Sequence, residues 1–267
     1  MKRVGLIGCG TIGTAIMAAF PTLLLNNLDL VAVLVRPGRS KLPPEIGAAP
    51  LTTDIEAFMR TRPDYVIEAA GHDAVIAYGE AILSRSCEFH VLSVGALADD
   101  AVRERLLKCA RSSGGRIVIP SGALAALDGL RSMREEGLES VKYTCTKPVS
   151  AWRSTAAEEE IDLDGLRAPQ SIFRGSARAA AKAYPRNANL AAAVAFAGLG
   201  LDRTQVELIA DPTALGNTAR LEARTANEML DLTFTRLGFR SNPKSSRITA
   251  MSAIAALASR SNAISFA

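Results

Sequence analysis

The stretch that decides the fold of this chain is Val4-Gly5-Leu6-Ile7-Gly8-Cys9-Gly10-Thr11-Ile12-Gly13. An apolar run typical of a strand leads directly into three glycines with the spacing Gly-x-Gly-x-x-Gly, and a pattern of helical spacing follows. In such a setting Gly8 permits a tight turn, Gly10 lets a pyrophosphate approach the backbone, and Gly13 lets the helix pack closely against the strand. A glycine-rich turn that binds nothing is the alternative, but strand, spacing and helix together favour a dinucleotide-binding loop of the Rossmann type.

Short apolar runs and helical stretches alternate through the rest of the first half. The runs of strand character cover residues 4–7, 30–35, 65–67, 90–94 and 116–119, and the stretches of helical spacing cover residues 11–26, 54–60, 74–84 and 99–112. Asp54 and Asp99 stand where helix N-caps are expected. Because strands separated by helices are typical of parallel sheets, the pattern predicts an α/β fold with a doubly wound sheet.

The pattern changes after Pro120. Residues 141–145 and 230–234 alternate between apolar and polar side chains, which predicts half-buried antiparallel strands. Helical spacing occurs between them, over residues 176–184 and 188–199. This half of the chain therefore has the mixed pattern of an α+β domain.

These patterns predict two domains, as expected for a chain of this length. The first is a dinucleotide-binding domain over residues 1–120, and the second is the α+β domain over residues 121–242. An alanine-rich helical stretch over residues 245–259 returns after it. We expect the segment 243–267 to complete the first domain.

The residues after the second predicted strand bear on the choice of cofactor. An acidic residue about 20 positions beyond the glycine loop would bind the ribose 2′-hydroxyl of NAD, but no carboxylate stands within Arg36-Pro37-Gly38-Arg39. Arg36 and Arg39 could instead pair with a 2′-phosphate through charge-assisted hydrogen bonds, and solvated loop positions are the alternative. The amides of Thr11 and Ile12, at the start of the first helix, complete the predicted phosphate site. The pattern favours NADP over NAD.

Composition narrows the class of protein. Of the 267 residues 48% are hydrophobic and 22% are charged, and the net charge of +4 is not gathered into a basic run. These values predict an ordinary globular protein and argue against a nucleic-acid partner. The four cysteines form no Cys-x-x-Cys pair, so no metal site or disulfide framework is expected, and no apolar stretch is long enough to span a membrane. We therefore expect a cytoplasmic protein with small anionic partners.

Further motifs follow the glycine loop in a set order. They are Glu68-Ala69-Ala70-Gly71-His72, Ser93-Val94-Gly95-Ala96-Leu97-Ala98-Asp99, Pro120-Ser121-Gly122-Ala123-Leu124, Lys147-Pro148, Pro185-Arg186-Asn187-Ala188-Asn189-Leu190-Ala191-Ala192, Ala210-Asp211-Pro212 and Asn242-Pro243-Lys244-Ser245-Ser246. With these motifs the chain resembles the L-aspartate dehydrogenase family over nearly its whole length. The ordered set is much more specific than the glycine loop, which many unrelated oxidoreductases share.

The resemblance implies a homodimeric oxidoreductase that uses NAD or NADP. It would convert L-aspartate to iminoaspartate, and so to oxaloacetate and ammonia, or run in reverse, and iminoaspartate can feed NAD biosynthesis. Residues 121–242 then form the domain for substrate binding and dimerisation. Carried over residue by residue, the resemblance assigns cofactor contacts to Ala123 and Asn189. The alternative for Ala123 is an alanine at the start of a helix, and the alternative for Asn189 is a helix-capping asparagine.

One position departs from the family's pattern. Around Asn217-Thr218-Ala219 the family pattern resembles Asn-x-His, with the histidine as catalytic acid/base, but this chain has Ala219. A methyl group cannot transfer a proton, and loss of a positioned acid/base costs roughly 10²–10⁴-fold in rate. Two alternatives therefore stay open: an NADP-dependent imine reductase or amine dehydrogenase with another substrate, and a dinucleotide-binding protein with weak turnover or none.

The remaining candidates for the site are polar residues near expected strand ends. His72 stands where open parallel sheets bind ligands, with a plain loop histidine as the alternative. Lys147 could bind a substrate carboxylate, or act as a base if burial lowers its pKa, and a solvated strand-end lysine is the alternative. Lys244 and Ser121 are further candidates for substrate binding. His90 lies within an apolar strand, where a hydrogen-bonded structural role is favoured.

Overall fold

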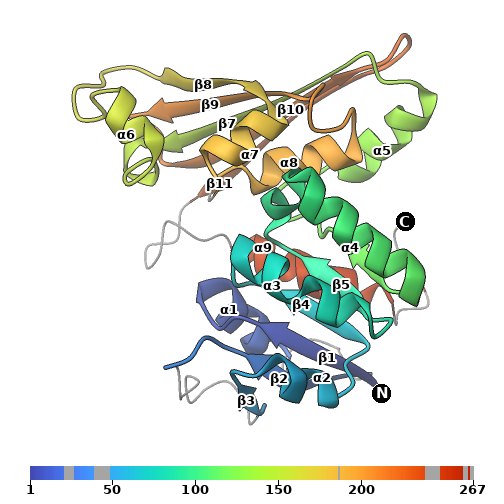
Figure 1. Cartoon of the computed structure of the whole chain (residues 1–267). Coiled ribbons are helices and arrows are strands. Elements are labelled where there is room, and N and C mark those ends of the chain that lie inside the picture. The colour runs from blue at the N-terminus through green and yellow to red at the C-terminus, as the bar shows by residue number, and fades with distance from the viewer. Residues whose placement is uncertain (21–26, 39–48, 186, 238–246, 261–263, 265–267) are drawn as a thin grey trace. The chain divides into compact units, whose positions relative to one another are not determined.

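The structure is a computed structural model that describes residues 1–20, 27–38, 49–185, 187–237, 247–260 and 264. The chain divides into two compact units (Figure 1). Unit 1 consists of Met1–Gly122 together with Arg247–Ala267, and unit 2 consists of Ala123–Ser246.

Unit 1 is built on a parallel sheet of six strands in the order β3-β2-β1-β4-β5-β6. The strands are β1 (Lys2–Ile7), β2 (Leu28–Leu34), β3 (Leu51–Thr52), β4 (Tyr65–Glu68), β5 (Glu88–Val91) and β6 (Arg116–Val118). The direction in which strands are added reverses between β1 and β4, and ligands of such sheets bind at this switch point. The predicted Rossmann-type doubly wound sheet is confirmed.

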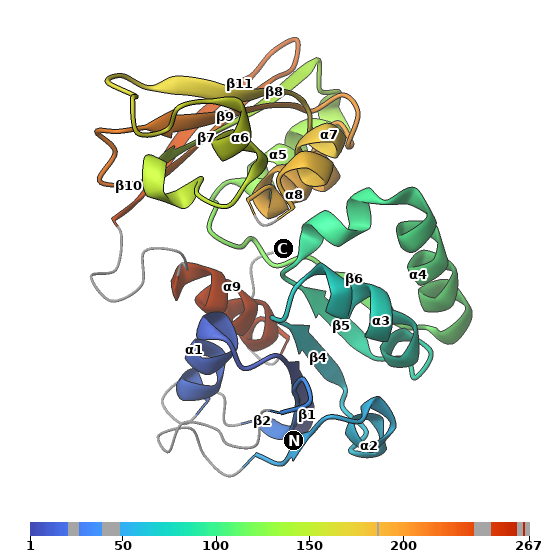
Figure 2. The same ribbon diagram turned by 60° about the vertical axis from the view of Figure 1, so that its left-hand side comes forward.

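Helices cover both faces of this sheet. They are α1 (Thr11–Ala19), α2 (Ile55–Arg60), α3 (His72–Leu83), α4 (Asp100–Ser113) and α9 (Arg247–Ala258), with the 3₁₀ helix η1 (Val94–Ala98) before α4. Figure 2 shows α1 and α9 side by side on one face, and α3 and α4 on the other. The carboxylates of Asp54 and Asp99 accept hydrogen bonds from amides in the first turns of α2 and α4, so both predicted N-caps are confirmed.

The helix α9 is part of the core of unit 1. Ala250, Ala253, Ile254 and Leu257 are buried in one cluster with apolar residues of β1, β2 and α1. The small alanine side chains let α9 lie close against α1. Unit 1 is therefore discontinuous in sequence, because residues 123–246 lie between its two segments.

Unit 2 is built on a mixed sheet of five strands in the order β11-β10-β7-β9-β8. The strands are β7 (Ser140–Pro148), β8 (Gln170–Ser176), β9 (Gln205–Asp211), β10 (Gly216–Arg224) and β11 (Met229–Leu237). The strands β7 and β9 run parallel, and the other neighbours run antiparallel. The predicted strands at 141–145 and 230–234 lie in β7 and β11, and the predicted second α+β domain is confirmed.

Among the described residues, three helices cover one face of this second sheet. They are α5 (Leu127–Glu136), α7 (Ala177–Ala183) and α8 (Asn189–Ala197), as Figure 1 shows. Along β7 the residues Val141, Tyr143 and Cys145 are buried, whereas Lys142 and Thr144 between them are partly exposed. The buried residues define the helix-covered face of unit 2, and the alternation follows from the two-residue period of a strand.

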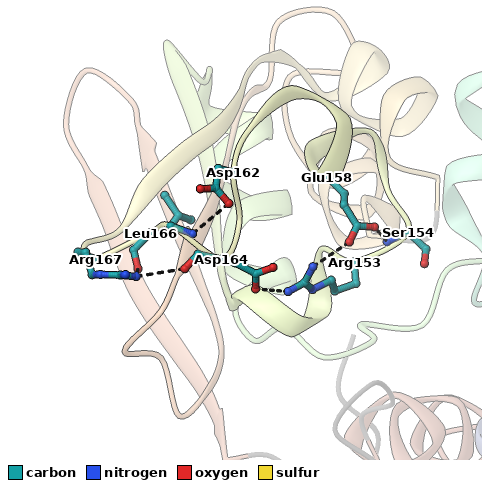
Figure 3. Close-up of polar contacts among 8 residues, drawn as sticks. Arg153, Ser154, Glu158, Asp162, Asp164, Leu166 and Arg167 are labelled. Atoms are coloured by element: carbon teal, nitrogen blue, oxygen red, sulfur yellow. Dashed lines mark hydrogen bonds and ion pairs between the residues drawn. The ribbon is translucent and has the colours of Figure 1, made fainter.

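The segment between β7 and β8 is held by its own polar contacts. It contains η2 (Val149–Ala151) and α6 (Ala156–Glu160). In Figure 3 the guanidinium of Arg153 lies between Glu158 and Asp164, with Nη1 3.0 Å from Oε1 of Glu158. The amide of Ser154 donates a hydrogen bond of 2.7 Å to Oε2 of Glu158. These contacts begin one residue after Trp152, so they restrain the segment that carries this buried side chain.

Candidate functional site

The glycine loop follows β1 at the switch point of the unit 1 sheet. Gly8 has a φ of +94°, and a Cβ there would lie 2.8 Å from the carbonyl oxygen of Ala69, so a larger residue does not fit. A Cβ at Gly13 would lie 2.1 Å from the carbonyl oxygen of Gly8. A Cβ at Gly10, in contrast, would meet no described atom within 4 Å. The fold itself therefore requires Gly8 and Gly13, whereas Gly10 faces open space.

The open space at Gly10 fits the pyrophosphate of a dinucleotide. Gly10 is the N-cap residue of α1, and it has no side chain that could fill the end of the helix. Thr11 is exposed and Ile12 is half-buried, and the first turn of α1 contains no acidic residue that would repel an anion. Backbone amides and the helix dipole attract negative charge at this end. The loop thus meets the requirements that its glycine spacing predicts.

A buried carboxylate joins the two loops next to the glycine loop. Glu68, the last residue of β4, is completely buried. Its Oε1 accepts hydrogen bonds from the amides of Ala70 and Gly71, both at 2.7 Å, and from Oγ of Ser93 at 2.9 Å. Its Oε2 accepts a hydrogen bond of 2.9 Å from the Ser93 amide. Because all of these groups donate, Glu68 holds the loop after β4 against the loop after β5.

The other candidates in unit 1 follow strand ends. Arg36 is exposed two residues after β2, and within the described part of the chain its guanidinium has no hydrogen-bond or ion-pair partner. His72 is the half-buried first residue of α3, and Ser121 is exposed after β6. All three follow the carboxyl ends of parallel strands, where open α/β sheets bind ligands. Arg39 lies outside the described residues.

Lys147 is the main titratable candidate in unit 2. It stands near the end of β7 and is only 9% exposed, so the alternative of a solvated lysine is wrong. Its Nζ donates a 2.6 Å hydrogen bond to Oδ1 of Asn187 and lies 5.1 Å from the centre of the Trp152 ring. Burial lowers the pKa of Lys147 from its usual 10.5; Cys145 opposes this shift and the charge of Arg236 adds to it. A buried amine of lowered pKa can exchange a proton closer to neutral pH than a solvated lysine can.

The two positions that the family resemblance assigns to the cofactor lie in unit 2. Ala123 is 1% exposed and stands in a turn before α5, so it is not the helix-start alanine of the alternative interpretation. Asn189 is the first residue of α8, and Ala188 is the N-cap residue, so the capping interpretation of Asn189 is also wrong. The predicted cofactor contacts of both residues stay predictions. Lys244 lies outside the described residues.

Ala219 lies on the same face as Lys147. It pairs with Cys145 of β7 on one side and with Phe234 of β11 on the other, and it is completely buried. Directly paired side chains share a face, so the methyl group of Ala219 points to the helix-covered face. The chain contains two histidines, His72 and His90, and neither belongs to unit 2. Unit 2 therefore contains no histidine.

The structural role expected for His90 agrees with its surroundings. His90 is completely buried in β5, and its Nε2 lies 2.9 Å from Oε1 of Glu88. Among the described residues, no group of three or more His, Cys, Asp or Glu side chains is placed to hold a metal ion. No helix in the described ranges combines the length and the apolar character that crossing a membrane requires.

The sequence motifs contain Glu68 and Asn187, but no role was predicted for these two residues or for Arg236. A carboxylate at the end of the apolar run Tyr65-Val66-Ile67 was a usable signal for Glu68, because a buried acid needs several donors. Arg236 continues the apolar positions of β11, and a cation in that register is unusual enough to mark it. For Asn187 the only signal was its place within a longer motif.

Two protein families match the chain. Residues 8–120 match the family described as Homoserine dehydrogenase, NAD binding domain, and residues 128–260 match Aspartate dehydrogenase, C-terminal. The chain is 38% identical over 268 residues to the L-aspartate dehydrogenase of Ralstonia pickettii, covering 99% of this chain and 100% of the relative. It is 40% identical over 278 residues to the L-aspartate dehydrogenase of Pseudomonas aeruginosa, with the same coverage of 99% and 100%.

Solved structures show the same fold. The aspartate dehydrogenase of Thermotoga maritima superposes with a TM-score of 0.75 at 23% identity, covering 100% of both chains. A dihydrodipicolinate reductase of Paenisporosarcina gives a TM-score of 0.53 at 13% identity, covering 95% of this chain and 92% of that one. Both are similar in fold, which agrees with the sheet order of unit 1.

Proposed function

Because the chain belongs to the L-aspartate dehydrogenase family, we propose that it oxidises L-aspartate to iminoaspartate with NAD⁺ or NADP⁺ as the oxidant. L-Aspartate loses a hydride from its α-carbon and a proton from its amino group, so the products are iminoaspartate, NAD(P)H and H⁺. Water then replaces the imino nitrogen, which yields oxaloacetate and ammonia. The observation that carries the proposal is the similarity to L-aspartate dehydrogenases over both units. It favours a working dehydrogenase over the two alternatives that Ala219 raised.

The glycine loop is the proposed site for the pyrophosphate of the cofactor. The amides of Thr11 and Ile12 donate to phosphate oxygens at the start of α1, in the open space beside Gly10. Ala123 and Asn189 make further contacts to the dinucleotide in this proposal. The bound cofactor supplies the hydride acceptor of the oxidation and the hydride donor of the reverse reaction.

The proposed preference is for NADP over NAD. Arg36 supports it, since this exposed guanidinium follows β2 without a described partner, and Arg39 belongs to the same stretch of sequence. Arg36→Ala should weaken NADP⁺ binding about 10-fold, the loss of one charge-assisted contact, and leave NAD⁺ binding unchanged. Calorimetric titration measures both, with Arg111→Ala, an exposed position on α4, as the control. Tighter binding of NAD⁺ than of NADP⁺ by the unmodified protein contradicts the preference.

Lys147 is the proposed proton carrier. Ala219 has no group that can take the amino proton of the substrate, whereas the neutral Nζ of a lysine with lowered pKa can. The hydrogen bond to Asn187 and the Trp152 ring hold Nζ in place. When protonated, the same Nζ can bind a substrate carboxylate.

Other residues complete the proposed substrate site. His72 is assigned a place beside the nicotinamide, and Ser121 and Lys244 are assigned contacts to the substrate. These assignments come from the sequence positions, and for His72 and Ser121 from their place after parallel strands.

We also propose that the enzyme is a homodimer, that unit 2 provides both the substrate-binding and the dimer-forming surfaces, and that the enzyme works in the cytoplasm. There iminoaspartate can feed NAD biosynthesis. Analytical ultracentrifugation tests the dimer, and a monomer at micromolar concentration contradicts it.

Steady-state assays test the activity itself. The unmodified protein should oxidise L-aspartate with a higher kcat/KM than L-asparagine or L-alanine, and absence of aspartate turnover with both cofactors contradicts the function. Gly10→Val should abolish cofactor binding without lowering Tm, because the added side chain enters open space. Gly129→Val is the matched control, since a Cβ at this α5 position also meets no described atom within 4 Å. Unchanged cofactor affinity in Gly10→Val contradicts the site.

A further inference from the structure

The helix-covered face of unit 2 carries two cations from different strands. The register of β10 and β11 places Phe234 opposite Ala219, and Arg236 follows Phe234 by two positions. Ala219 in turn lies opposite Cys145 of β7, which Lys147 follows by two positions. Because residues two apart on a strand share a face, Arg236 and Lys147 both lie on the face that carries Ala219.

Neither cation has an anionic partner among the described residues. Nε of Arg236 is buried and has no hydrogen-bond partner there. Nζ of Lys147 donates to the neutral Oδ1 of Asn187 at 2.6 Å. A buried donor without an acceptor destabilises a protein, and so does a buried charge without a counter-charge. Two such groups on one face point to an anionic ligand.

Two acidic side chains of the same sheet, Glu207 and Asp231, cannot serve as these partners. Oε2 of Glu207 lies 2.9 Å from Nζ of Lys142, and Oδ2 of Asp231 lies 2.7 Å from Nη2 of Arg220. Each of these four residues is next in sequence to a residue of the helix-covered face. Because successive residues of a strand point to opposite faces, all four side chains belong to the opposite face. These two ion pairs therefore lie on the face away from Arg236 and Lys147.

The positive charge of Arg236 acts on the pKa values of two side chains of β7, Lys147 and Tyr143. Burial lowers the pKa of Lys147, Cys145 opposes this, and the charge of Arg236 lowers it further. Burial and Cys145 raise the pKa of Tyr143 well above its usual 10.0, and Arg236 again acts in the opposite direction. These effects require the guanidinium to lie within electrostatic range of both side chains. A carboxylate beside Arg236 would supply the acceptor that its guanidinium lacks, whether Lys147 is charged or neutral.

We propose that Arg236 is a specificity-determining residue that binds one carboxylate of the amino-acid substrate on the face shared with Lys147. The inference rests on the proposed function, because L-aspartate brings two carboxylates. A guanidinium donates two parallel hydrogen bonds to a carboxylate, which a lysine ammonium cannot do. An amino acid with one carboxylate leaves Arg236 unpaired, so the residue that binds dicarboxylates also discriminates against other substrates.

Arg236→Met tests the proposal, with Arg220→Met as the matched control. Methionine keeps an unbranched side chain and removes the charge. Arg220 lies on the neighbouring strand but on the opposite face, so its loss removes a cation from the same sheet away from the site. We expect Arg236→Met to raise the KM for L-aspartate and the inhibition constant of succinate about 10- to 100-fold, with cofactor affinity unchanged. In Arg220→Met both constants should change by less than about twofold.

The outcomes separate this inference from the proposed function. If Arg236→Met folds, as circular dichroism shows, and its constants for aspartate and succinate are unchanged, the inference is overturned. Should Arg236→Met not fold, Arg236→Lys decides, because it keeps the charge and loses the paired hydrogen bonds; an unchanged inhibition constant of succinate then overturns the inference. If the unmodified protein does not oxidise L-aspartate, the proposed function fails. Calorimetric titration of succinate into the cofactor-bound protein and its Arg236 variants then still shows whether Arg236 binds dicarboxylates.

Discussion

Replacing Glu68 by glutamine removes the negative charge at the centre of the contacts that join the loops after β4 and β5. The carboxylate accepts four hydrogen bonds, three at Oε1 and one at Oε2. Glutamine has a single side-chain oxygen. When that oxygen takes the place of Oε1, the side-chain NH₂ faces the amide of Ser93, and two donors meet.

The expected cost follows from these contacts. The buried amide of Ser93 loses its acceptor, which costs about 1–3 kcal/mol. The three remaining hydrogen bonds lose their charge assistance, at roughly 1–2 kcal/mol together. Relief from burying a charge offsets part of this. We expect Glu68→Gln to lower the free energy of unfolding by about 2–4 kcal/mol.

Cofactor affinity should fall as well, because a Cβ at Gly8 would already lie 2.9 Å from Cβ of Ala70, so the glycine loop and the loop after β4 are closely packed. Urea unfolding followed by circular dichroism measures the stability, and calorimetric titration measures the affinity. Hydrogen exchange gives a local readout, since the amides of Gly71 and Ser93 should exchange faster. Glu104→Gln, an exposed position on α4, is the control. A stability change below about 0.5 kcal/mol, with unchanged exchange at these amides, refutes the reasoning.

Three further changes test other parts of the molecule. Lys147→Met should lower kcat by about 10²–10⁴-fold, and the pH profile of kcat/KM of the unmodified enzyme should report a group with a pKa below 10.5; an unaffected kcat argues against a proton carrier. The hydrogen bond from Lys142 lowers the pKa of Glu207 below its usual 4.5, so the stabilisation is present above pH 4.5 and is lost as the pH falls through the lowered value. The urea midpoint of Glu207→Gln should therefore lie below that of the unmodified protein at neutral pH, and the two midpoints should approach each other in acid. A difference that does not depend on pH contradicts this. Ala219→His should raise kcat for L-aspartate and lower the stability by about 1–3 kcal/mol, because Ala219 is completely buried. If kcat falls while KM stays unchanged, the position no longer serves an acid/base.

Features that depend on neighbours in the sequence could be predicted. The glycine loop and the alternation of strands and helices led to the doubly wound sheet, since right-handed connections leave few strand orders. Asp54 and Asp99 were recognisable as N-caps because the amides that they bind lie within three residues. The period of two over residues 141–145 marked the strand β7.

Features that depend on distant partners could not be predicted. The alternation of β7 is the same whether its neighbour is parallel or antiparallel, so the pairing with β9 was hidden. Lys147 and its partner Asn187 lie 40 positions apart, and only the fold shows that the lysine is buried and hydrogen-bonded. Arg236 and Lys147 lie on different strands, and only the register of β7, β10 and β11 shows that both residues lie on one face of the sheet. The predicted roles of Arg39 and Lys244 stay predictions, because both lie outside the described residues.

The place of α9 in the core of unit 1 sets an order of events during protein synthesis. The ribosome releases residues 1–122 first, but their apolar cluster lacks Ala250, Ala253, Ile254 and Leu257 until the codons for residues 247–258 have been translated. Unit 2 is continuous, so it can fold while the nascent β1, β2 and α1 still present an uncovered apolar surface. Chaperones that recognise such surfaces are expected to bind unit 1 during this interval. The fold of unit 1 is complete only after α9 has been synthesised, and bound cofactor can stabilise unit 1 from that point on. We therefore expect the dinucleotide-binding unit to fold late, after unit 2.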